Sequence, residues 1–172
     1  APFQDTTFDA ALPMPAELAI GVSYQMNDKW LFAFDYNRAF WGVYESLDIQ
    51  FANGVESVNP RNYQDANIWR FGAQYAATDK LTLRVGYYYD ETPVQPGYFA
   101  PETPRNDSQG FTAGLSLDLA PRLALDASFA YVRFSEVDAS YDHYQENGVT
   151  MPFGGTYKSN AFIAGLGLTY NL

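Results

Sequence analysis

The tail of the chain, from Ala161 to Leu172, alternates between two kinds of side chain. The even-numbered positions hold Phe162, Ala164, Leu166, Leu168, Tyr170 and Leu172, and the odd-numbered ones hold Ala161, Ile163, Gly165, Gly167, Thr169 and Asn171. One side of this segment is apolar and the other is mostly small or polar. A period of two is the signature of a β-strand whose two faces meet different surroundings.

Six further segments repeat this template and place their apolar side chains on one face. With the tail, they predict antiparallel strands at 17–25, 29–51, 66–77, 80–90, 107–119, 122–135 and 159–172. Most of these strands are about ten residues long or longer, whereas strands of soluble sheets usually have about five or six residues. The sequence therefore predicts an all-β fold with about seven strands in a single unit, residues 1–172.

The position of the charges distinguishes a soluble β-sandwich from a membrane barrel. Arg70, Arg84, Asp118 and Asp126 all lie on the face opposite the apolar residues. Tyr, Trp or Phe closes one or both ends of most apolar faces, as in the aromatic girdles of outer-membrane barrels. No run approaches the roughly 18 consecutive apolar residues that a transmembrane helix needs. We therefore predict a transmembrane antiparallel β-barrel in a bacterial outer membrane.

Composition excludes several other classes. Cysteine is absent, so no disulfide framework or thiol nucleophile is available. The net charge of -10 argues against a nucleic-acid partner. We expect no cofactor. We also expect no metal site, because the acidic residues do not have the spacing of a calcium loop. These residues are Glu136, Asp138, Asp142 and Glu146.

The connections between the predicted strands alternate between short and long. Short turns fall at 26–28, 78–79 and 120–121, and long loops at about 52–65, 91–106 and 136–158. Outer-membrane barrels have short periplasmic turns and long external loops. This rule places the C-terminus in the periplasm and residues 1–16 in an extracellular loop.

The segment 29–51 must then cross the membrane once, so that all the short turns lie on one side. Its apolar face changes from even numbers at Phe34 and Tyr36 to odd numbers at Leu47 and Ile49. A β-bulge near Trp41-Gly42 would explain this change of phase. If 29–51 formed two strands instead, the chain would be a small eight-stranded barrel.

Seven strands are an awkward number for a closed barrel. Bacterial barrels generally have even strand counts, and an open sheet edge in lipid leaves costly unpaired amides. We therefore expect a second chain or an N-terminal half to complete the barrel. The start of this chain in an external loop would follow from a nick, a split chain or a truncation.

Several motifs occur in an order that is similar to a known family. They are Leu12-Pro13-Met14-Pro15 before the Ala19–Tyr24 strand, Asp79–Tyr87, Asp90-Glu91-Thr92-Pro93-Val94 and Pro104-Arg105-Asn106-Asp107. Over residues 12–172, these motifs resemble the FadL family of outer-membrane transporters of long-chain fatty acids and other hydrophobic compounds. The resemblance implies a 14-stranded barrel that is plugged by a hatch domain and of which this chain forms the last seven strands. It also implies passive uptake through the barrel wall, with outer-membrane lipid and hydrophobic small molecules as partners.

The candidate ligand-binding residues lie on the strands and in the loops. Arg70 and Arg84 on the charged face, with Tyr88, could bind an anionic head group, or the arginines could pair with Asp118 or Asp126. Arg61 is a weaker candidate for an anionic ligand, since a solvated loop charge explains it better. The aromatic candidates are Tyr98 and Phe99, as a landing site or a small loop core, and Phe40 and Trp41, as a passage lining or part of the aromatic girdle.

Two alternative functions remain open. A FadL-like barrel could serve as a scaffold or shuttle subunit of an outer-membrane secretion complex. A small barrel enzyme that acts on lipids would need a histidine beside a nucleophile, but His143, the sole histidine, lies in a polar loop and has no serine two residues later. We therefore predict no catalytic residues and a passive conduit.

Overall fold

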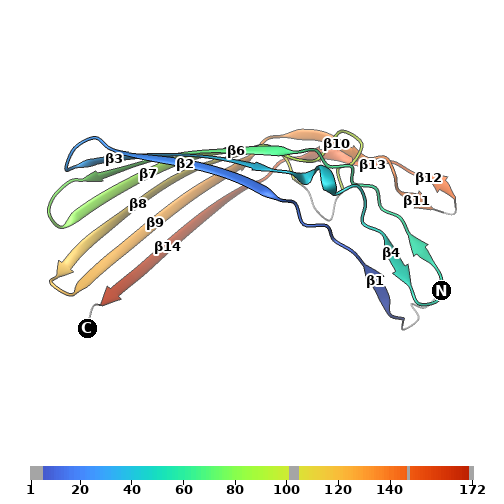
Figure 1. Cartoon of the computed structure of the whole chain (residues 1–172), viewed down its shortest axis with the longest axis horizontal. Helices are drawn as coiled ribbons and strands as arrows, with labels where there is room; N and C mark the ends of the chain where they lie inside the picture. Colours follow the sequence, from blue (N-terminus) through green and yellow to red (C-terminus); the bar gives the residue numbers. More distant parts are fainter. Residues whose placement is uncertain (1–5, 101–104, 147, 171–172) are drawn as a thin grey trace.

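The computed structural model describes residues 6–100, 105–146 and 148–170. Seven antiparallel strands form its main sheet, in the spatial order β14-β9-β8-β7-β6-β3-β2 (Figure 1). Their bounds are β2 Glu17–Gln25, β3 Trp30–Ala39, β6 Ala66–Ala76, β7 Leu81–Asp90, β8 Ser108–Ala120, β9 Leu123–Phe134 and β14 Asn160–Tyr170. Each strand pairs with its neighbour along the sheet, as in the wall of an up-and-down barrel. The predicted all-β class and the count of seven strands are confirmed.

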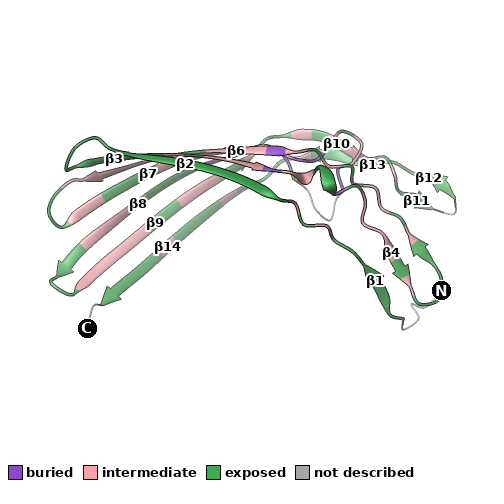
Figure 2. Ribbon diagram, viewed as in Figure 1, coloured by how far each residue is buried: buried purple, intermediate pink, exposed green. Residues whose placement is uncertain are grey.

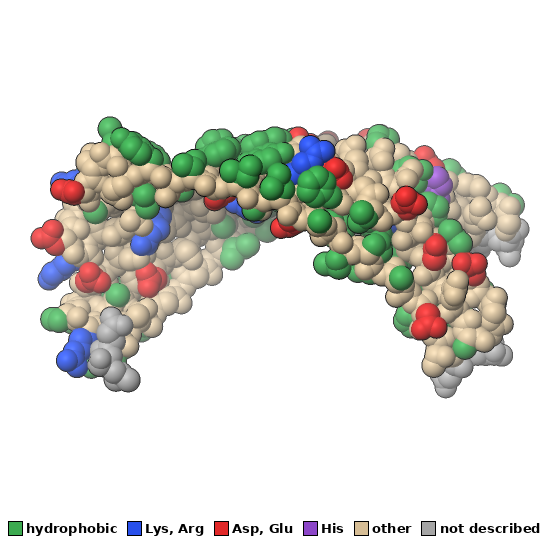
Figure 3. Space-filling view, in the orientation of Figure 1, with side chains coloured by type: hydrophobic (Ala, Val, Ile, Leu, Met, Phe, Trp, Pro, Cys, Tyr) green, Lys and Arg blue, Asp and Glu red, His purple; other side chains and the backbone are tan. Residues whose placement is uncertain are grey.

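The register gives the sheet two chemically different faces. On the first, which we call the apolar face, Phe34, Phe71, Tyr87 and Phe111 lie in one row across four strands. On the second, the polar face, Asp35, Arg70 and Tyr88 lie in one row. Hydrophobic side chains gather along the convex side of the arched molecule, with charged side chains beneath it (Figure 3).

The apolar face is exposed within the described part of the chain. Long stretches of the strands are exposed (Figure 2). On the apolar face, Val85 is 60% exposed and Leu166 is 85% exposed, although both are apolar. A soluble domain would bury such a face against another layer. A sheet of this kind is stable only where something apolar, such as lipid, covers it.

The buried residues lie at one end of the strands and beyond it, where the long loops gather. We call this region the loop end; it comprises residues 40–65, 91–100 and 135–158 of the described chain. Its enclosed side chains include Tyr44, Arg61, Pro93, Phe99, Ala100 and Tyr141. The long loops therefore pack on one another as a small folded layer at one edge of the sheet.

The structure corrects the prediction of one strand over 29–51. Strand β3 ends at Ala39, and the 3-10 turn η1, Trp41–Val43, follows it. The next strand, β4 Ile49–Phe51, leaves the main sheet and pairs with β1 Phe8–Ala10 and β5 Glu56–Ser57. The predicted bulge near Trp41-Gly42 is therefore wrong, because the apolar phase changes where the chain turns out of the sheet. The eight-stranded alternative fails as well, because only β3 of this segment joins the sheet.

The loop end contains four more short strands. Strand β10 Val137–Tyr141 pairs with β13 Phe153–Tyr157, and β11 Gln145–Glu146 pairs with β12 Val149–Thr150. They project the hairpin between β9 and β14 past the main sheet (Figure 1). Within the described residues, no helix is long and apolar enough to span a membrane.

Candidate functional site: the polar face and the loop end

A chain of hydrogen bonds crosses the polar face near the short turns. The Arg84 Nε donates to Gln74 Oε1 over 2.9 Å, and its Nη1 donates to Ser116 Oγ over 2.7 Å. Ser116 Oγ in turn donates to Asp126 Oδ1 over 2.5 Å. These hydrogen bonds link four neighbouring strands, β6 to β9, across the polar face. Arg84 was predicted either to bind an anionic head group or to pair with Asp118 or Asp126. In the structure it lies in a hydrogen-bond network that ends on the carboxylate of Asp126.

Arg70 lies nearer the loop end of the same face. Its Nη1 donates to Asn37 Oδ1 over 2.7 Å, and its neighbours in register are Asp35 and Tyr88. The Arg70 side chain remains exposed within the described structure. It can therefore meet a molecule that moves along this face.

Tyr88 lies flat against the sheet instead of projecting from it. Its ring covers Gly110 on the adjacent strand so closely that a Cβ at Gly110 would overlap ring atoms. Gly86 is likewise covered by Thr112 Oγ1. Glycine leaves room for these side chains to lean sideways, so the polar face carries a thin layer of polar groups and no packed core.

Arg61 is part of the core of the loop end. Its side chain is 3% exposed, and its guanidinium carbon lies 5.4 Å from the ring centroid of Tyr141. Tyr141 Oη donates to the carbonyl of Pro60 over 3.1 Å. Arg61 therefore holds two loops together through a cation–π contact and is neither a solvated charge nor an accessible anion site in this structure.

The aromatic candidates divide between the core of the loop end and its surface. Phe99 is 4% exposed and packs against Tyr157 with a centroid separation of 4.5 Å. Tyr98 stacks on His143 at 4.4 Å, and its hydroxyl accepts a hydrogen bond from Asn62 Nδ2 over 3.1 Å. Two roles were predicted for Phe99, a landing site for cargo and part of a small loop core. The structure places it in the loop core.

Phe40 and Trp41 mark the point where the chain leaves β3. The Arg38 guanidinium carbon lies 5.7 Å from the Phe40 ring centroid. Trp41 packs near Tyr44 and Tyr63, with centroid separations of 6.3 and 6.0 Å. Together they form an aromatic cluster at the junction between the sheet and the loop end.

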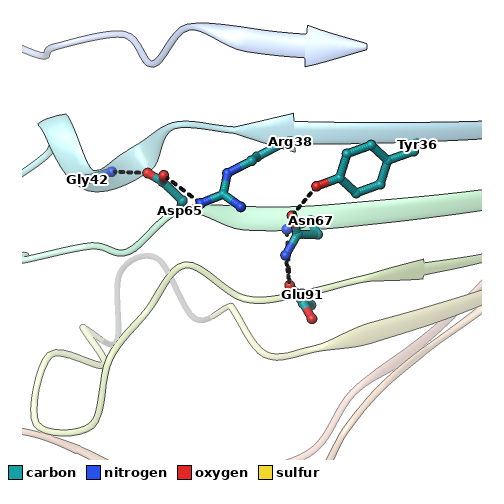
Figure 4. Close-up of polar contacts among 6 residues, drawn as sticks. All are labelled: Tyr36, Arg38, Gly42, Asp65, Asn67 and Glu91. Carbon is teal, nitrogen blue, oxygen red and sulfur yellow. Dashed lines mark hydrogen bonds and ion pairs between the residues drawn. The ribbon is translucent and has the colours of Figure 1, made fainter. Parts of the chain in front are cut away.

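A polar network lies where the apolar face meets the loop end (Figure 4). Tyr36 Oη donates to Asn67 Oδ1 over 2.7 Å, and Asn67 Nδ2 donates to Glu91 Oε2 over 2.6 Å. Beside them, Arg38 Nη2 forms an ion pair with Asp65 Oδ2 at 3.1 Å. Sequence reasoning missed this network, although its signal was present: the apolar phase of β3 and β6 reaches polar residues at Arg38 and Asn67.

An ion pair joins the two branches of the β9–β14 connection. Lys158 Nζ lies 2.9 Å from Glu136 Oε2, and this contact lowers the pKa of Glu136 below its usual value. The pair is exposed, so its effect on stability is small.

Within the described residues, no group of three or more His, Cys, Asp or Glu side chains could hold a metal ion. The polar face and the loop end offer hydrogen-bond donors, carboxylates and aromatic rings. Groups of these kinds can contact a molecule that passes along the polar face, and they suit a boundary between lipid and a polar interior.

The match to known proteins decides the family. The family model for outer membrane protein transport proteins (OMPP1/FadL/TodX) matches residues 4–172. The chain belongs to this family. Curated relatives include the 47 kDa outer membrane protein of Pasteurella multocida, which is 28% identical over 92% of this chain, and outer membrane protein P1 of Haemophilus influenzae, which is 28% identical over 95%. The chain spans only 35% and 36% of the lengths of these two relatives.

Solved structures show the same fold. A FadL homologue from Pseudomonas aeruginosa superposes with a TM-score of 0.84 and 22% identity, covering 95% of this chain and 37% of its own. The Pseudomonas putida toluene transporter TodX gives a TM-score of 0.61 and 24% identity, covering 97% and 37%. The predicted FadL resemblance is confirmed, and the seven-stranded sheet is one part of a barrel of this type.

Proposed function

We propose that the chain forms part of the wall of an outer-membrane channel through which hydrophobic compounds cross passively. The observation that carries the proposal is the two-faced sheet of a FadL-family chain. Its apolar face suits contact with lipid, while its polar face suits a lumen. Long-chain fatty acids are one candidate class of cargo. Monoaromatic hydrocarbons are another, since solved relatives include the monoaromatic hydrocarbon channel CymD and the toluene transporter TodX.

The proposed orientation places the short turns in the periplasm and the loop end outside the cell. In this arrangement the end of β14 faces the periplasm, and residues 1–16 belong to an extracellular segment. The contrast between tight turns at one edge and a folded layer of loops at the other supports this orientation, because outer-membrane barrels show the same asymmetry.

Strands β2 and β14 are the two edges of the main sheet. Strands from the rest of the protein, or from a second chain, would pair with both edges and close the barrel. Closure is needed because unpaired backbone amides are costly in lipid. The coverage of little more than a third of the relatives' length supports this proposal.

Six of the eight candidate residues remain proposed ligand contacts. Arg70, Arg84 and Tyr88 line the polar face, and Tyr98, Phe40 and Trp41 lie at the loop end. Arg61 and Phe99 instead stabilise the core of the loop end. We propose no catalytic residue and no cofactor.

Uptake by whole cells tests this function. A strain that lacks the full-length protein is complemented with the gene or an empty vector, and the initial uptake of labelled toluene and of a labelled long-chain fatty acid is measured. We expect uptake of at least one compound to rise above the vector control, with the compound recovered chemically unchanged. Equal uptake in both strains would contradict a channel, and a modified compound would favour the lipid-enzyme alternative.

A further inference from the structure

The apolar face carries very few charged side chains. On the seven strands of the described chain, the charged residues of this face are Arg38 and Arg133, and both are basic. Each is the last residue but one of its strand, at the loop end. A guanidinium group on a face that meets lipid is stabilised by an opposite charge, which either the protein or the lipid head groups must supply.

The two arginines differ in whether the protein supplies that charge. Arg38 Nη2 forms an ion pair with Asp65 Oδ2 at 3.1 Å (Figure 4). Arg133 is exposed, and none of the hydrogen bonds and ion pairs between described residues engages its guanidinium. On this face, Arg133 is therefore the cation that an external anion can reach without displacing a carboxylate.

The neighbours of Arg133 are further hydrogen-bond donors. The register places Gln109 on one side of it and Asn160 on the other, on the same face. Lys158 lies two residues before Asn160, and its Nζ is 2.9 Å from Glu136 Oε2, with both side chains more than half exposed. Lys158, and to a smaller extent Arg133, lower the pKa of Glu136, so both cations lie near one carboxylate. We call Gln109, Arg133, Lys158 and Asn160 the rim cluster.

A pair of aromatic rings lies next to the rim cluster on the apolar face. Tyr131 and Phe162 are stacked with a centroid separation of 4.8 Å, and Phe162 is 69% exposed. Aromatic rings in such positions mark the level at which lipid head groups meet the acyl chains. The rim cluster therefore lies at the height of the head groups, with an apolar surface beside it for acyl chains.

The adjoining part of this boundary carries the opposite charge. Glu91 directly follows β7 and accepts a hydrogen bond from Asn67 Nδ2, and Asp107 directly precedes β8 and accepts one from Tyr89 Oη. These carboxylates would repel an anionic head group. Such a head group is therefore favoured beside β9 and β14.

We propose that the rim cluster binds a phosphate group of lipid A, the phosphorylated glycolipid of the outer leaflet. The Arg133 guanidinium donates two parallel hydrogen bonds to phosphate oxygens, and Lys158 adds a second positive charge. The amides of Gln109 and Asn160 donate to the remaining oxygens. The acyl chains lie along the apolar face, against the stacked rings. This binding site goes beyond the proposed channel function, and it rests on the orientation with the loop end outside the cell.

Native mass spectrometry of the full-length protein in detergent tests the ligand. The probes are diphosphoryl lipid A, lipid A with both phosphates removed, and phosphatidylglycerol. We expect diphosphoryl lipid A to bind several-fold more tightly than either of the others, and added salt to weaken it. Equal binding of the dephosphorylated form would overturn phosphate recognition, and equal or tighter binding of phosphatidylglycerol would overturn the assignment to the glycolipid. Cargo uptake is a separate measurement, so the failure of this proposal is distinct from the failure of the channel function.

Matched variants assign the binding to the rim cluster. Arg133→Gln combined with Lys158→Gln removes both cations, whereas Lys80→Gln combined with Arg122→Gln makes the same change of net charge in two exposed short turns. We expect the first pair to weaken the binding of diphosphoryl lipid A several-fold and the second to leave it unchanged. Glu136→Gln removes the carboxylate that competes for the two cations, and it should tighten binding.

Gel mobility before and after heating shows whether each variant folds as a barrel. The location of the site is wrong if both pairs weaken binding equally, or if the first pair leaves it unchanged. Weaker binding by the Glu136→Gln variant would also contradict the proposal, and this variant tests the site even if the doubly substituted protein does not fold.

Discussion

Individual side chains on the polar face are arranged as pairs between adjacent strands. Tyr88 covers Gly110, and Arg84 reaches both Gln74 and Ser116. Each pair combines one long side chain with a small or polar partner. The face remains open because the long side chains lie along the sheet.

Gly110→Val tests whether Tyr88 needs this space. The new side chain would overlap the Tyr88 ring, and overpacking of this kind costs about 1–3 kcal/mol. We expect the full-length variant to lose its folded gel mobility at a lower temperature than the wild type. Gly155→Val is the control, because a Cβ there meets nothing within 4 Å. Equal melting of the two variants would refute the role of Gly110, and Tyr88→Ala should relieve the strain of Gly110→Val.

The Glu136–Lys158 pair predicts a local pH response. Because Lys158 lowers the pKa of Glu136, the pair stabilises the fold above the usual glutamate pKa. That contribution is lost as the pH falls through the lowered value. We expect carbon-13 NMR of the side-chain carboxyl to show Glu136 titrating below an ordinary glutamate, and Lys158→Met to return it towards the usual value. An unchanged titration in Lys158→Met would contradict the pairing.

At the scale of whole elements, the alternation of side chains places each strand and its faces. Strand β2 matches its predicted bounds, and β6 to β9 match theirs within one residue at each end. The predicted strand 159–172 starts one residue before β14, and its last two residues lie outside the described part. Period-two patterning succeeds here because each strand pairs with its neighbour in sequence, so local pattern and tertiary structure agree.

The failure at 29–51 and the unforeseen loop core share a physical cause. Leu47, Ile49 and Phe51 alternate like a membrane strand, yet β4 pairs with β1, which lies some forty residues earlier. Likewise, Arg61 contacts Tyr141 from another loop. Contacts between segments so far apart leave no periodic trace in the sequence. The residues of the polar face could be predicted from phase alone, but their hydrogen-bond partners could not.

A pair of lysine substitutions tests the assignment of the two faces. Ala113 lies on the apolar face between Val85 and Phe129, and its neighbour Thr112 lies on the polar face between Gly86 and Ala130. A lysine facing lipid costs roughly 2–4 kcal/mol near the membrane centre. We expect Ala113→Lys to lower the free energy of unfolding of the full-length protein in lipid vesicles by up to that amount, and Thr112→Lys to lower it by much less. Urea titration followed by tryptophan fluorescence measures both, and an equal or larger loss for Thr112→Lys would reverse the faces.

At the scale of the whole molecule, the described chain is a curved wall with a folded layer at one edge. Strands β2 and β14 both present one edge without a partner in the main sheet of the described structure. In lipid, such edges are costly because water is not available to bond the amides.

Separate expression of the parts tests this dependence. Residues 1–172 produced alone should fail to form a species whose gel mobility changes on heating. Production together with the remaining part of the full-length protein should restore it and allow both pieces to be purified together. A heat-modifiable barrel formed by residues 1–172 alone would contradict the requirement for further strands.

The concentration of buried side chains at the loop end also affects how related sequences can diverge. External loops are usually the most variable parts of a protein. Here, however, Pro93, Ala100 and Tyr141 are enclosed on all sides, whereas many apolar positions facing lipid accept any side chain of similar polarity. Evolutionary drift should therefore be slow in the interior of the loop end, faster on the strands, and fastest at exposed loop tips such as Gly54. The interior of the loop end would then keep its shape while its exposed tips change.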